Sequence, residues 1–279
     1  MCREVRCTCW VDDEDYPRCL AWQEESYQKP STLICENGTM QRIRLLTLNT
    51  WLLPFPLALD RKLRLQRTLA LIRRLKPDII CLQEVWLGTD VKKIRRALST
   101  YYAHAPDCLF NRSGMMFFSR FPITRTTTIS IGKGEYWYDA FLHRQALCCH
   151  VEAHIPLKIY AVHLNSCDTD DEAQRVLQQF KYLNYIRQKN AFLMGDLNLD
   201  KHQLLPHLSA WKVISPLTHT LSSKNPYDQK GANLRRHLSD RVLDYVLVSK
   251  QLSHEIVSAR VIKRPLYSDH YPVLVDVHC

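Results

Sequence analysis

The amino-acid sequence predicts an α/β or α+β protein in which sheets and helices pack as layers. Short apolar runs of strand length recur along most of the 279-residue chain, and amphipathic segments of helical period lie between them. The hydrophobic fraction is 46% and the charged fraction 24%, as in ordinary globular proteins. This composition excludes a disordered, collagen-like or coiled-coil chain.

The chain divides near residue 40. Residues 1–40 show neither a helical nor a strand period, so we interpret them as a partly irregular extension that precedes a folded domain of residues 41–279. The extension contains five cysteines, Cys2, Cys7, Cys9, Cys19 and Cys35. Their spacing matches no paired Cys-x-x-Cys pattern, which leaves zinc binding and lipidation open without predicting either.

The cysteine usage indicates reduced thiols. The chain has 11 cysteines, an odd number, and Cys81 and Cys148 lie inside apolar runs where a thiol packs as a small hydrophobic group. A disulfide framework is therefore not expected. A reducing compartment, the cytoplasm, is the predicted location.

The first half of the domain predicts strands around one clear helix. Residues 43–49, 79–82 and 115–118 are short apolar runs of strand type. Between them, Asp60 is placed to cap a helix that runs to Leu75, with Pro77 just beyond its end. Leucines and Ile72 recur on one side of this helix and are expected to face the core. Its outward cations are Arg61, Lys62, Arg64, Arg67, Arg73 and Arg74.

The second half continues the same alternation. Apolar runs at residues 146–154 and 158–164 predict two neighbouring strands joined through Pro156, and residues 172–188 predict a helix. The remaining strands are expected at residues 191–194, 242–248 and 272–277.

The charge balance favours an anionic partner. Lys and Arg exceed Asp and Glu by 38 to 28, giving a formal charge of +10 and a pI near 9.1. No apolar run approaches the roughly 18 residues that a spanning helix needs. The first residues lead into no apolar segment, so a secretory signal is not expected either.

Polar side chains follow the predicted strands at the points where they end. The segments are Leu48-Asn49, Leu82-Gln83-Glu84, Val162-His163, Gly195-Asp196-Leu197-Asn198, Leu243-Asp244-Tyr245 and Ser268-Asp269-His270. Each has a purely structural explanation by itself, such as an Asx turn or a solvated strand end. Together they offer oxygen ligands for a hard cation and imidazoles for proton transfer. This combination on a basic protein predicts hydrolysis of a phosphate ester.

These segments, extended to Gln83-Glu84-Val85-Trp86, His163-Leu164-Asn165 and Ser268-Asp269-His270-Tyr271-Pro272-Val273, resemble the endonuclease/exonuclease/phosphatase superfamily. The resemblance covers residues 42–279, with the motifs in family order. It implies a deoxyribonuclease I-like, four-layer αββα sandwich of two mixed β-sheets flanked by helices, and it makes residues 41–279 the catalytic domain. Asn49-Thr50-Trp51 and Glu84-Val85-Trp86 are most similar to neutral, Mg²⁺-dependent sphingomyelinases. Trp51 stands where the base-excision endonuclease branch has an acidic residue.

The resemblance also implies a metal site. Glu84 would ligate Mg²⁺, or Mn²⁺ in its place, and Asn49 and Asp269 would complete that side directly or through water. Arg144, just before a predicted strand, would contact phosphate, although a solvated loop cation explains it equally well.

The remaining motif residues are implied to act on the substrate. Asp196 would orient or activate the attacking water, Asn198 would hold a phosphate oxygen, and His163 would stabilise the developing charge. His270 would be the second acid/base group, and Asp244 would hold its tautomer and raise its basicity.

Two functions of the same fold remain open. A lipid phosphodiesterase would act on a phospholipid such as sphingomyelin and sit peripherally at membranes. It requires exposed apolar loops, and residues 51–57, with Trp51, Leu53 and Phe55, and residues 135–138 are the candidates. The alternative is a nuclease acting on DNA or RNA. A catalytically silent scaffold is disfavoured because no motif position is lost, and no obligate protein partner is predicted.

Overall fold

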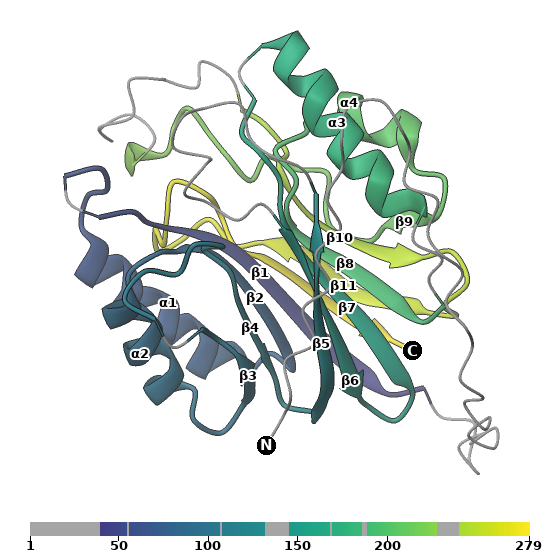
Figure 1. Ribbon diagram of the computed structural model, residues 1–279, viewed down its shortest axis with the longest axis horizontal. Coiled ribbons are helices and arrows are strands. Elements are labelled where there is room, and N and C mark those ends of the chain that lie inside the picture. The colour runs from purple at the N-terminus through teal and green to yellow at the C-terminus, as the bar shows by residue number, and fades with distance from the viewer. Residues whose placement is uncertain are drawn as a thin grey trace.

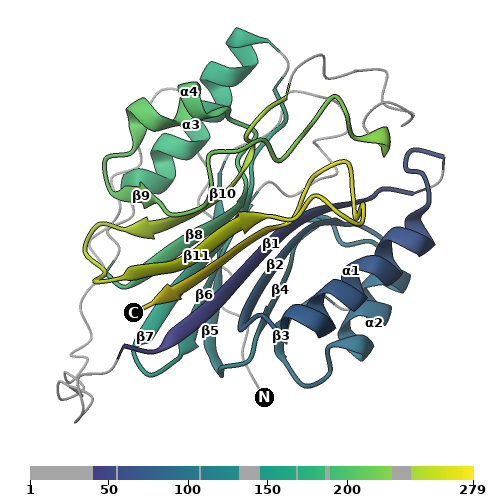
Figure 2. The same cartoon turned by 180° about the vertical axis from the view of Figure 1, so that it is seen from behind.

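The computed structural model describes residues 40–54, 56–106, 108–131, 145–167, 169–185, 189–227 and 240–279. Two six-stranded sheets pack against each other, and helices cover the outer face of each (Figures 1 and 2). This is the four-layer αββα arrangement of two mixed sheets that the motif resemblance implies.

The first sheet has the strand order β11-β12-β1-β2-β4-β3. Its strands are β1 (Arg42–Leu52), β2 (Ile79–Val85), β3 (Tyr102–His104), β4 (Met116–Ser119), β11 (Glu255–Val261) and β12 (Val273–His278). Helices α1 (Arg61–Leu75) and α2 (Gly88–Ala97) cover its outer face. The centre of the sheet is β1, which pairs parallel with β2 and antiparallel with β12.

The second sheet has the order β5-β6-β7-β8-β10-β9. Its strands are β5 (Ile123–Ser130), β6 (Gln145–Glu152), β7 (Pro156–His163), β8 (Ala191–Asp196), β9 (Trp211–Val213) and β10 (Asp244–Ser249). Helices α3 (Asp170–Tyr185) and α4 (Lys201–Leu204) lie on its outer side (Figure 1). A short 3-10 turn, Leu205–His207, follows α4.

The core sits between the sheets and under the helices. In β1, Ile43 and Leu45 point into the cluster between the two sheets, whereas Leu46 and Leu48 point into the cluster beneath α1 and α2. Successive side chains of a strand face opposite sides, so a strand buried on both faces reads as a continuous apolar run. This is why the central strands were recognisable in the sequence.

The topology brings several strand ends to one edge. Because β1 and β2 are parallel, as are β7 and β8, each pair ends on the same side. Asn49 is paired with Gln83 across the first sheet, and in the second sheet Asp196 is paired with both His163 and Asp244. The predicted convergence of polar strand ends is therefore present in the backbone.

The sequence-predicted strands and both helices are present with small shifts at their ends. Six helices and strands were not predicted, namely α2, α4, β3, β5, β9 and β11. Strand β5 has the sequence ITRTTTIS and β11 EIVSARV, and both are largely exposed edge strands without an apolar run. Helix α2 begins at Gly88 without a side-chain cap. None of these carries the pattern from which the other elements were read.

Two details of α1 differ from expectation. Asp60 precedes the helix in a left-handed conformation, but its carboxylate makes no capping hydrogen bond and instead accepts one from the Tyr227 hydroxyl, at 3.2 Å. Arg64 was expected to face solvent and is fully buried. Its guanidinium lies under β1, where backbone carbonyl oxygens replace water as its partners.

The predicted free, buried state of Cys81 and Cys148 is confirmed. No helix among the described residues is long and apolar enough to cross a membrane. Residues 1–39 of the extension and the 135–138 segment lie outside the described residues.

Candidate active site

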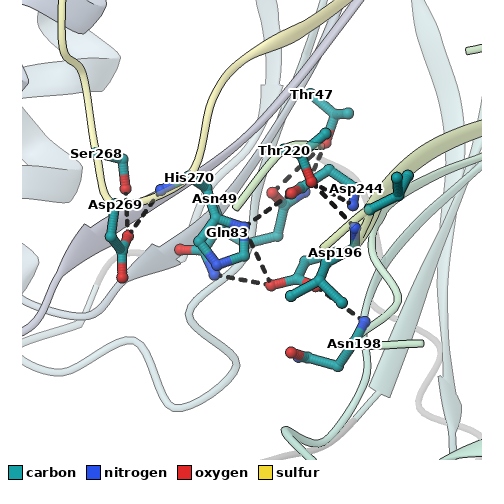
Figure 3. Close-up of polar contacts among 12 residues, drawn as sticks. Thr47, Asn49, Gln83, Asp196, Asn198, Thr220, Asp244, Ser268, Asp269 and His270 are labelled. Carbon is teal, nitrogen blue, oxygen red and sulfur yellow. Dashed lines mark hydrogen bonds and ion pairs between the residues drawn. The ribbon is translucent and has the colours of Figure 1, made fainter. Parts of the chain in front are cut away.

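Asn49 lies at the centre of the strand-end cluster and joins the two sheets (Figure 3). Its side-chain Nδ2 donates to Glu84 Oε1 and to Asp196 Oδ2, both at 3.0 Å. Its Oδ1 accepts the backbone N–H of Trp51 at 3.1 Å, which fixes the orientation of the amide. The family resemblance implies that Asn49 is a metal ligand. In this structure, however, its side-chain nitrogen faces the two carboxylates and its oxygen accepts a backbone hydrogen bond.

Glu84 is held at the end of β2 by an unusual backbone conformation. Its φ of 58° lies in the left-handed region, which is costly for a residue with a side chain and is found where the surroundings enforce it. The preceding residue is fixed because the Thr50 hydroxyl donates to the Gln83 carbonyl at 2.7 Å. The side chain of Glu84 keeps 18% of its surface exposed, so the carboxylate is accessible at the mouth of the site.

Asp244 and His270 form a buried pair in the second half of the site. His270 Nδ1 lies 2.8 Å from Asp244 Oδ2 and 3.8 Å from Asp196 Oδ2. Burial by itself lowers the pKa of the His270 imidazole, but Asp244, Asp196 and Asp269 together raise that pKa well above its ordinary value. These carboxylates therefore favour the charged form of the imidazole, in the direction expected from the pairing with Asp244.

Asp196 is almost completely buried among these groups. Burial raises the pKa of its carboxyl to about 7, with a further contribution from the negative charge of Asp244, against the opposing effect of His270. Its Oδ1 accepts the backbone N–H of Asn198 at 2.9 Å. A carboxyl with a pKa near 7 can accept and release a proton at physiological pH.

His163 and Asn198 complete the floor of the site. His163 Nε2 lies 3.8 Å from Asp196 Oδ2 and 4.0 Å from Glu84 Oε1. Asn198 is left-handed, with a φ of 49°, and its Nδ2 donates to the Leu164 carbonyl at 3.0 Å. Because the nitrogen of the Asn198 amide is used by this bond, the side-chain oxygen is the atom available as a hydrogen-bond acceptor.

The donor set fits a hard divalent cation. Glu84 offers an accessible carboxylate in a neighbourhood of oxygen atoms and imidazoles, which suits Mg²⁺ or Mn²⁺. Asp196, Asp244 and His270 also place one ligand atom each within 4.8 Å of one another. In that trio, however, His270 Nδ1 is already in hydrogen-bond contact with Asp244, which a metal would have to break. Glu84 is therefore the better anchor for a cation.

Asp269 lies beside His270, and one of its carboxylate oxygens already accepts two hydrogen bonds. Its Oδ1 accepts the Ser268 hydroxyl at 2.7 Å and the His270 N–H at 3.0 Å (Figure 3). This turn fixes the backbone that carries His270. A metal contact through Asp269 remains a prediction.

Two buried polar residues that position the site were missed in the sequence. The Thr220 hydroxyl accepts the N–H groups of Leu243 and Asp244, at 3.0 and 3.1 Å. Asn225 Nδ2 donates to the carbonyls of Ser268 and Asp269, at 2.9 and 2.8 Å. Both stand in irregular segments without periodicity, so no signal in the sequence identified them.

The predicted membrane segment is only partly exposed, and the prediction for Trp51 is wrong. Trp51 has only 2% of its surface exposed and packs with Ala58 and Tyr227. Leu53 is half-buried against the same cluster. The left-handed conformation of Trp51, with a φ of 47°, turns its ring inward. Phe55 and Arg144 lie outside the described residues.

Comparison with known proteins identifies the family of the chain. The profile of the Endonuclease/Exonuclease/phosphatase family matches residues 46–270. Among curated proteins, the chain is 29% identical to Sphingomyelin phosphodiesterase 2 of Mus musculus over 184 residues, or 58% of this chain and 43% of that protein. It is 25% identical to a putative neutral sphingomyelinase of Caenorhabditis elegans over 187 residues, or 59% of this chain and 43% of that protein. The matched region thus spans less than half the length of these relatives.

Solved structures share the fold at low identity. Sphingomyelinase C from Streptomyces griseocarneus has a TM-score of 0.64 and 16% identity, covering 85% of this chain and 99% of that one. D. rerio TDP2, complexed with single strand DNA product, has a TM-score of 0.66 and 15% identity, covering 86% and 100%. At these identities the likeness shows the fold alone. The profile match over most of the domain shows that the chain belongs to the Endonuclease/Exonuclease/phosphatase family.

Proposed function

We propose that the chain is a metal-dependent phosphodiesterase whose substrate is a phospholipid of the sphingomyelin type. The observation that carries the hydrolytic part is the single cluster in which Asn49, Glu84, His163, Asp196 and the Asp244–His270 pair meet. A bound divalent cation at Glu84 would supply charge stabilisation at the phosphate.

The side chains supply the proton transfers. Asp196, with its pKa near neutrality, accepts a proton from the attacking water. His270 uses Nδ1 to contact Asp244, so its Nε2 is the atom that donates a proton to the leaving oxygen. His163 contacts the phosphate group, and the side-chain oxygen of Asn198 accepts a hydrogen bond from the attacking water. The oxygen of the water forms the new P–O bond as its proton passes to Asp196. The leaving oxygen departs with the electrons of the broken P–O bond and takes a proton from His270.

An apolar rim beside Glu84 supports a lipid substrate. Exposed apolar side chains gather where α1 and α2 begin, namely Leu57, Leu59, Leu63, Leu109 and Phe110, and Leu109 is 92% exposed. The two helix starts are neighbours because Arg61 forms an ion pair with Asp90. The Leu109 carbonyl accepts the Gly88 N–H at 2.8 Å, which ties the rim to the loop that follows Glu84.

Such a rim suits the surface of a bilayer. Exposed leucines gain free energy when they leave water, roughly 1.5–3 kcal/mol for complete burial of one side chain. The exposed Lys62 next to Leu63 adds a cation for lipid phosphates. The names of the curated relatives, a sphingomyelin phosphodiesterase and a neutral sphingomyelinase, point to the same substrate.

Nucleic acid is the second candidate substrate. A hollow of about 520 Å³ at the end of α2 is lined by Lys92, Arg95 and Arg96, together with Ser99 and Tyr101. Three cations in one hollow on a protein of charge +10 could follow a phosphate backbone. Tyr101, the aromatic residue of this hollow, is half-buried and donates its hydroxyl to the Pro77 carbonyl at 2.9 Å, whereas the apolar rim is exposed, which favours the lipid.

The deciding experiment is a substrate panel. Sphingomyelin vesicles, lysophospholipid, plasmid DNA and RNA are incubated with Mg²⁺ and with EDTA, and the Asp196→Asn and His270→Ala variants serve as inactive controls. We expect Mg²⁺-dependent release of the phosphorylated headgroup from sphingomyelin. Cleavage of DNA or RNA alone would replace the lipid assignment with the nuclease one, and turnover that survives exhaustive chelation would exclude the metal.

A rim variant separates membrane contact from chemistry. Leu57→Ser, Leu63→Ser and Leu109→Ser are combined, and the matched control replaces Ile256 and Val257, exposed apolar residues of β11, with Ser. We expect the rim variant to lose vesicle binding and vesicle hydrolysis while it retains cleavage of a soluble phosphodiester. Equal vesicle activity in the two variants would remove the rim from the proposal.

A further inference from the structure

Arg64 is a fully buried cation that donates hydrogen bonds to three backbone carbonyl oxygens. Its Nε donates to the Leu59 carbonyl at 2.8 Å, Nη1 to the Thr50 carbonyl at 2.6 Å and Nη2 to the Trp51 carbonyl at 2.9 Å. The guanidinium also lies 4.8 Å from the centre of the Trp51 ring and 5.4 Å from that of Tyr227. Burying a charge is costly unless its donors are satisfied. Here three guanidinium nitrogens donate to carbonyl oxygens, so the charge and the backbone around it stabilise each other.

Two of the carbonyls that Arg64 holds, those of Thr50 and Trp51, belong to the turn that orients Asn49. Trp51 adopts a left-handed conformation, at the position where the pairing of β1 with β2 shifts register. In this conformation the Trp51 N–H reaches Asn49 Oδ1, and Asn49 Nδ2 then faces Glu84 and Asp196. The clamp on its carbonyl adds to the packing of the Trp51 ring in holding this residue in a conformation that side chains disfavour.

We propose that Arg64 is a positioning residue of the active site. It fixes the left-handed turn at Trp51, and through that turn it holds Asn49 between the two carboxylates. Arg64 itself touches no reacting atom. The proposal rests on the proposed phosphodiesterase function for its kinetic test, but not for the structural test described below.

Replacing Arg64 should reduce turnover more than substrate binding. We expect Arg64→Ala to lower kcat by roughly 10–100-fold, the range found for residues that orient catalytic ligands, with KM for a soluble phosphodiester changed little. Arg64→Lys should give an intermediate loss, because an ammonium keeps the charge but not the planar fork that reaches three carbonyls. Millimolar guanidinium should partly restore Arg64→Ala.

Arg44 offers a matched control because, like Arg64, it is an arginine that joins β1 to α1. Arg44 lies near the start of β1, whereas Asn49 lies near its end. It donates to the Leu75 carbonyl at the end of α1, at 2.6 Å, and to Asp276 in β12. Arg44→Ala should lower the thermal midpoint, leave kcat of the folded protein unchanged and gain nothing from guanidinium. If both variants lose activity only in proportion to their loss of stability, Arg64 is a structural residue and the proposal is overturned.

A double-mutant cycle tests the route through Asn49. If Arg64 acts by orienting Asn49, the loss caused by Arg64→Ala should be much smaller in an Asn49→Ala background than in the wild type. The same fold loss in both backgrounds would overturn the proposal. Should Arg64→Ala fail to fold, the cycle is run with Arg64→Lys, whose loss should vanish in the same background.

Amide hydrogen exchange provides a readout that needs no turnover. Peptides that contain the Trp51 amide should exchange faster in Arg64→Ala or Arg64→Lys, and unchanged exchange there would contradict the clamp. The same peptides should be unaffected in Arg44→Ala. If the wild-type protein cleaves nothing in the substrate panel, the proposed function fails, whereas the exchange result still decides on Arg64.

Discussion

Asp196 should make the folded protein less stable as the pH rises through the weakly acidic range. Its carboxyl has an ordinary pKa of 3.8, and burial with the nearby charge of Asp244 raises that pKa to about 7 in the folded state. Between these two values the folded protein holds a proton that the unfolded chain releases. The free energy of unfolding therefore falls with increasing pH across this window.

The expected size follows from the linkage relation. Each pH unit inside the window costs about 1.4 kcal/mol, so the change from pH 5 to pH 6.5 amounts to about 2 kcal/mol. For a domain of this size that corresponds to a fall in Tm of roughly 4–8 °C. Asp276, with a pKa of about 2, titrates below this window, and the raised pKa of His270 affects stability at higher pH. Burial lowers the pKa of His150, which acts in the opposite sense inside the window, so the contribution of Asp196 is the difference between the wild type and a variant that lacks this carboxyl.

The Asp196→Asn variant isolates this effect. It has no carboxyl to titrate, so its Tm should change much less than that of the wild type between pH 5 and pH 6.5, measured in EDTA by calorimetry. Its turnover should fall by about 10²–10⁴-fold, since a positioned acid/base group contributes that much. A variant whose Tm falls as steeply as that of the wild type would refute the assignment of the buried, proton-holding carboxyl to Asp196.

Three further outcomes are expected. Glu84→Gln should abolish Mg²⁺-stimulated turnover and weaken Mn²⁺ binding measured by paramagnetic resonance, and undiminished binding would place the cation elsewhere. Asp244→Asn should move the pH limit of activity assigned to His270 to lower pH, because the charge of Asp244 raises the His270 pKa, and an unchanged pH profile would give Asp244 another role. Gly195→Ala should destabilise the domain by at least about 2 kcal/mol in a thermal melt, since its added Cβ would lie 1.9 Å from the Val162 carbonyl oxygen at a φ of 146°, and a normal melt would contradict that clash.

The sequence was sufficient for the central strands and for the residues that meet at the site. Strands such as β2 and β8 are buried on both faces, so their apolar runs are unbroken and the polar residues at their ends stand out. The edge strands β5 and β11 gave no such signal because exposed positions accept polar side chains.

The supporting contacts could not be read from the sequence. Arg64 has the spacing of a solvated helix face, and only the path of β1 over the helix shows that its partners are carbonyl oxygens. Trp51 was taken for an exposed aromatic residue because a left-handed turn at a tryptophan has no sequence signature. Thr220 and Asn225 act through backbone groups that are distant in sequence, and pattern analysis does not reach such pairs.

The order of strands in the first sheet has a consequence for synthesis of the protein. Strand β12 lies between β1 and β11 and follows every other described strand in the sequence, so β1 waits for its antiparallel neighbour while all of those strands are synthesised. His270 arrives on the same late segment. During translation the nascent chain thus carries an open edge at β1 and an incomplete site, a combination that exposes it to aggregation and to chaperones. The Asp244–His270 contact and the pairing of β1 therefore form only after residues 270–278 have been synthesised.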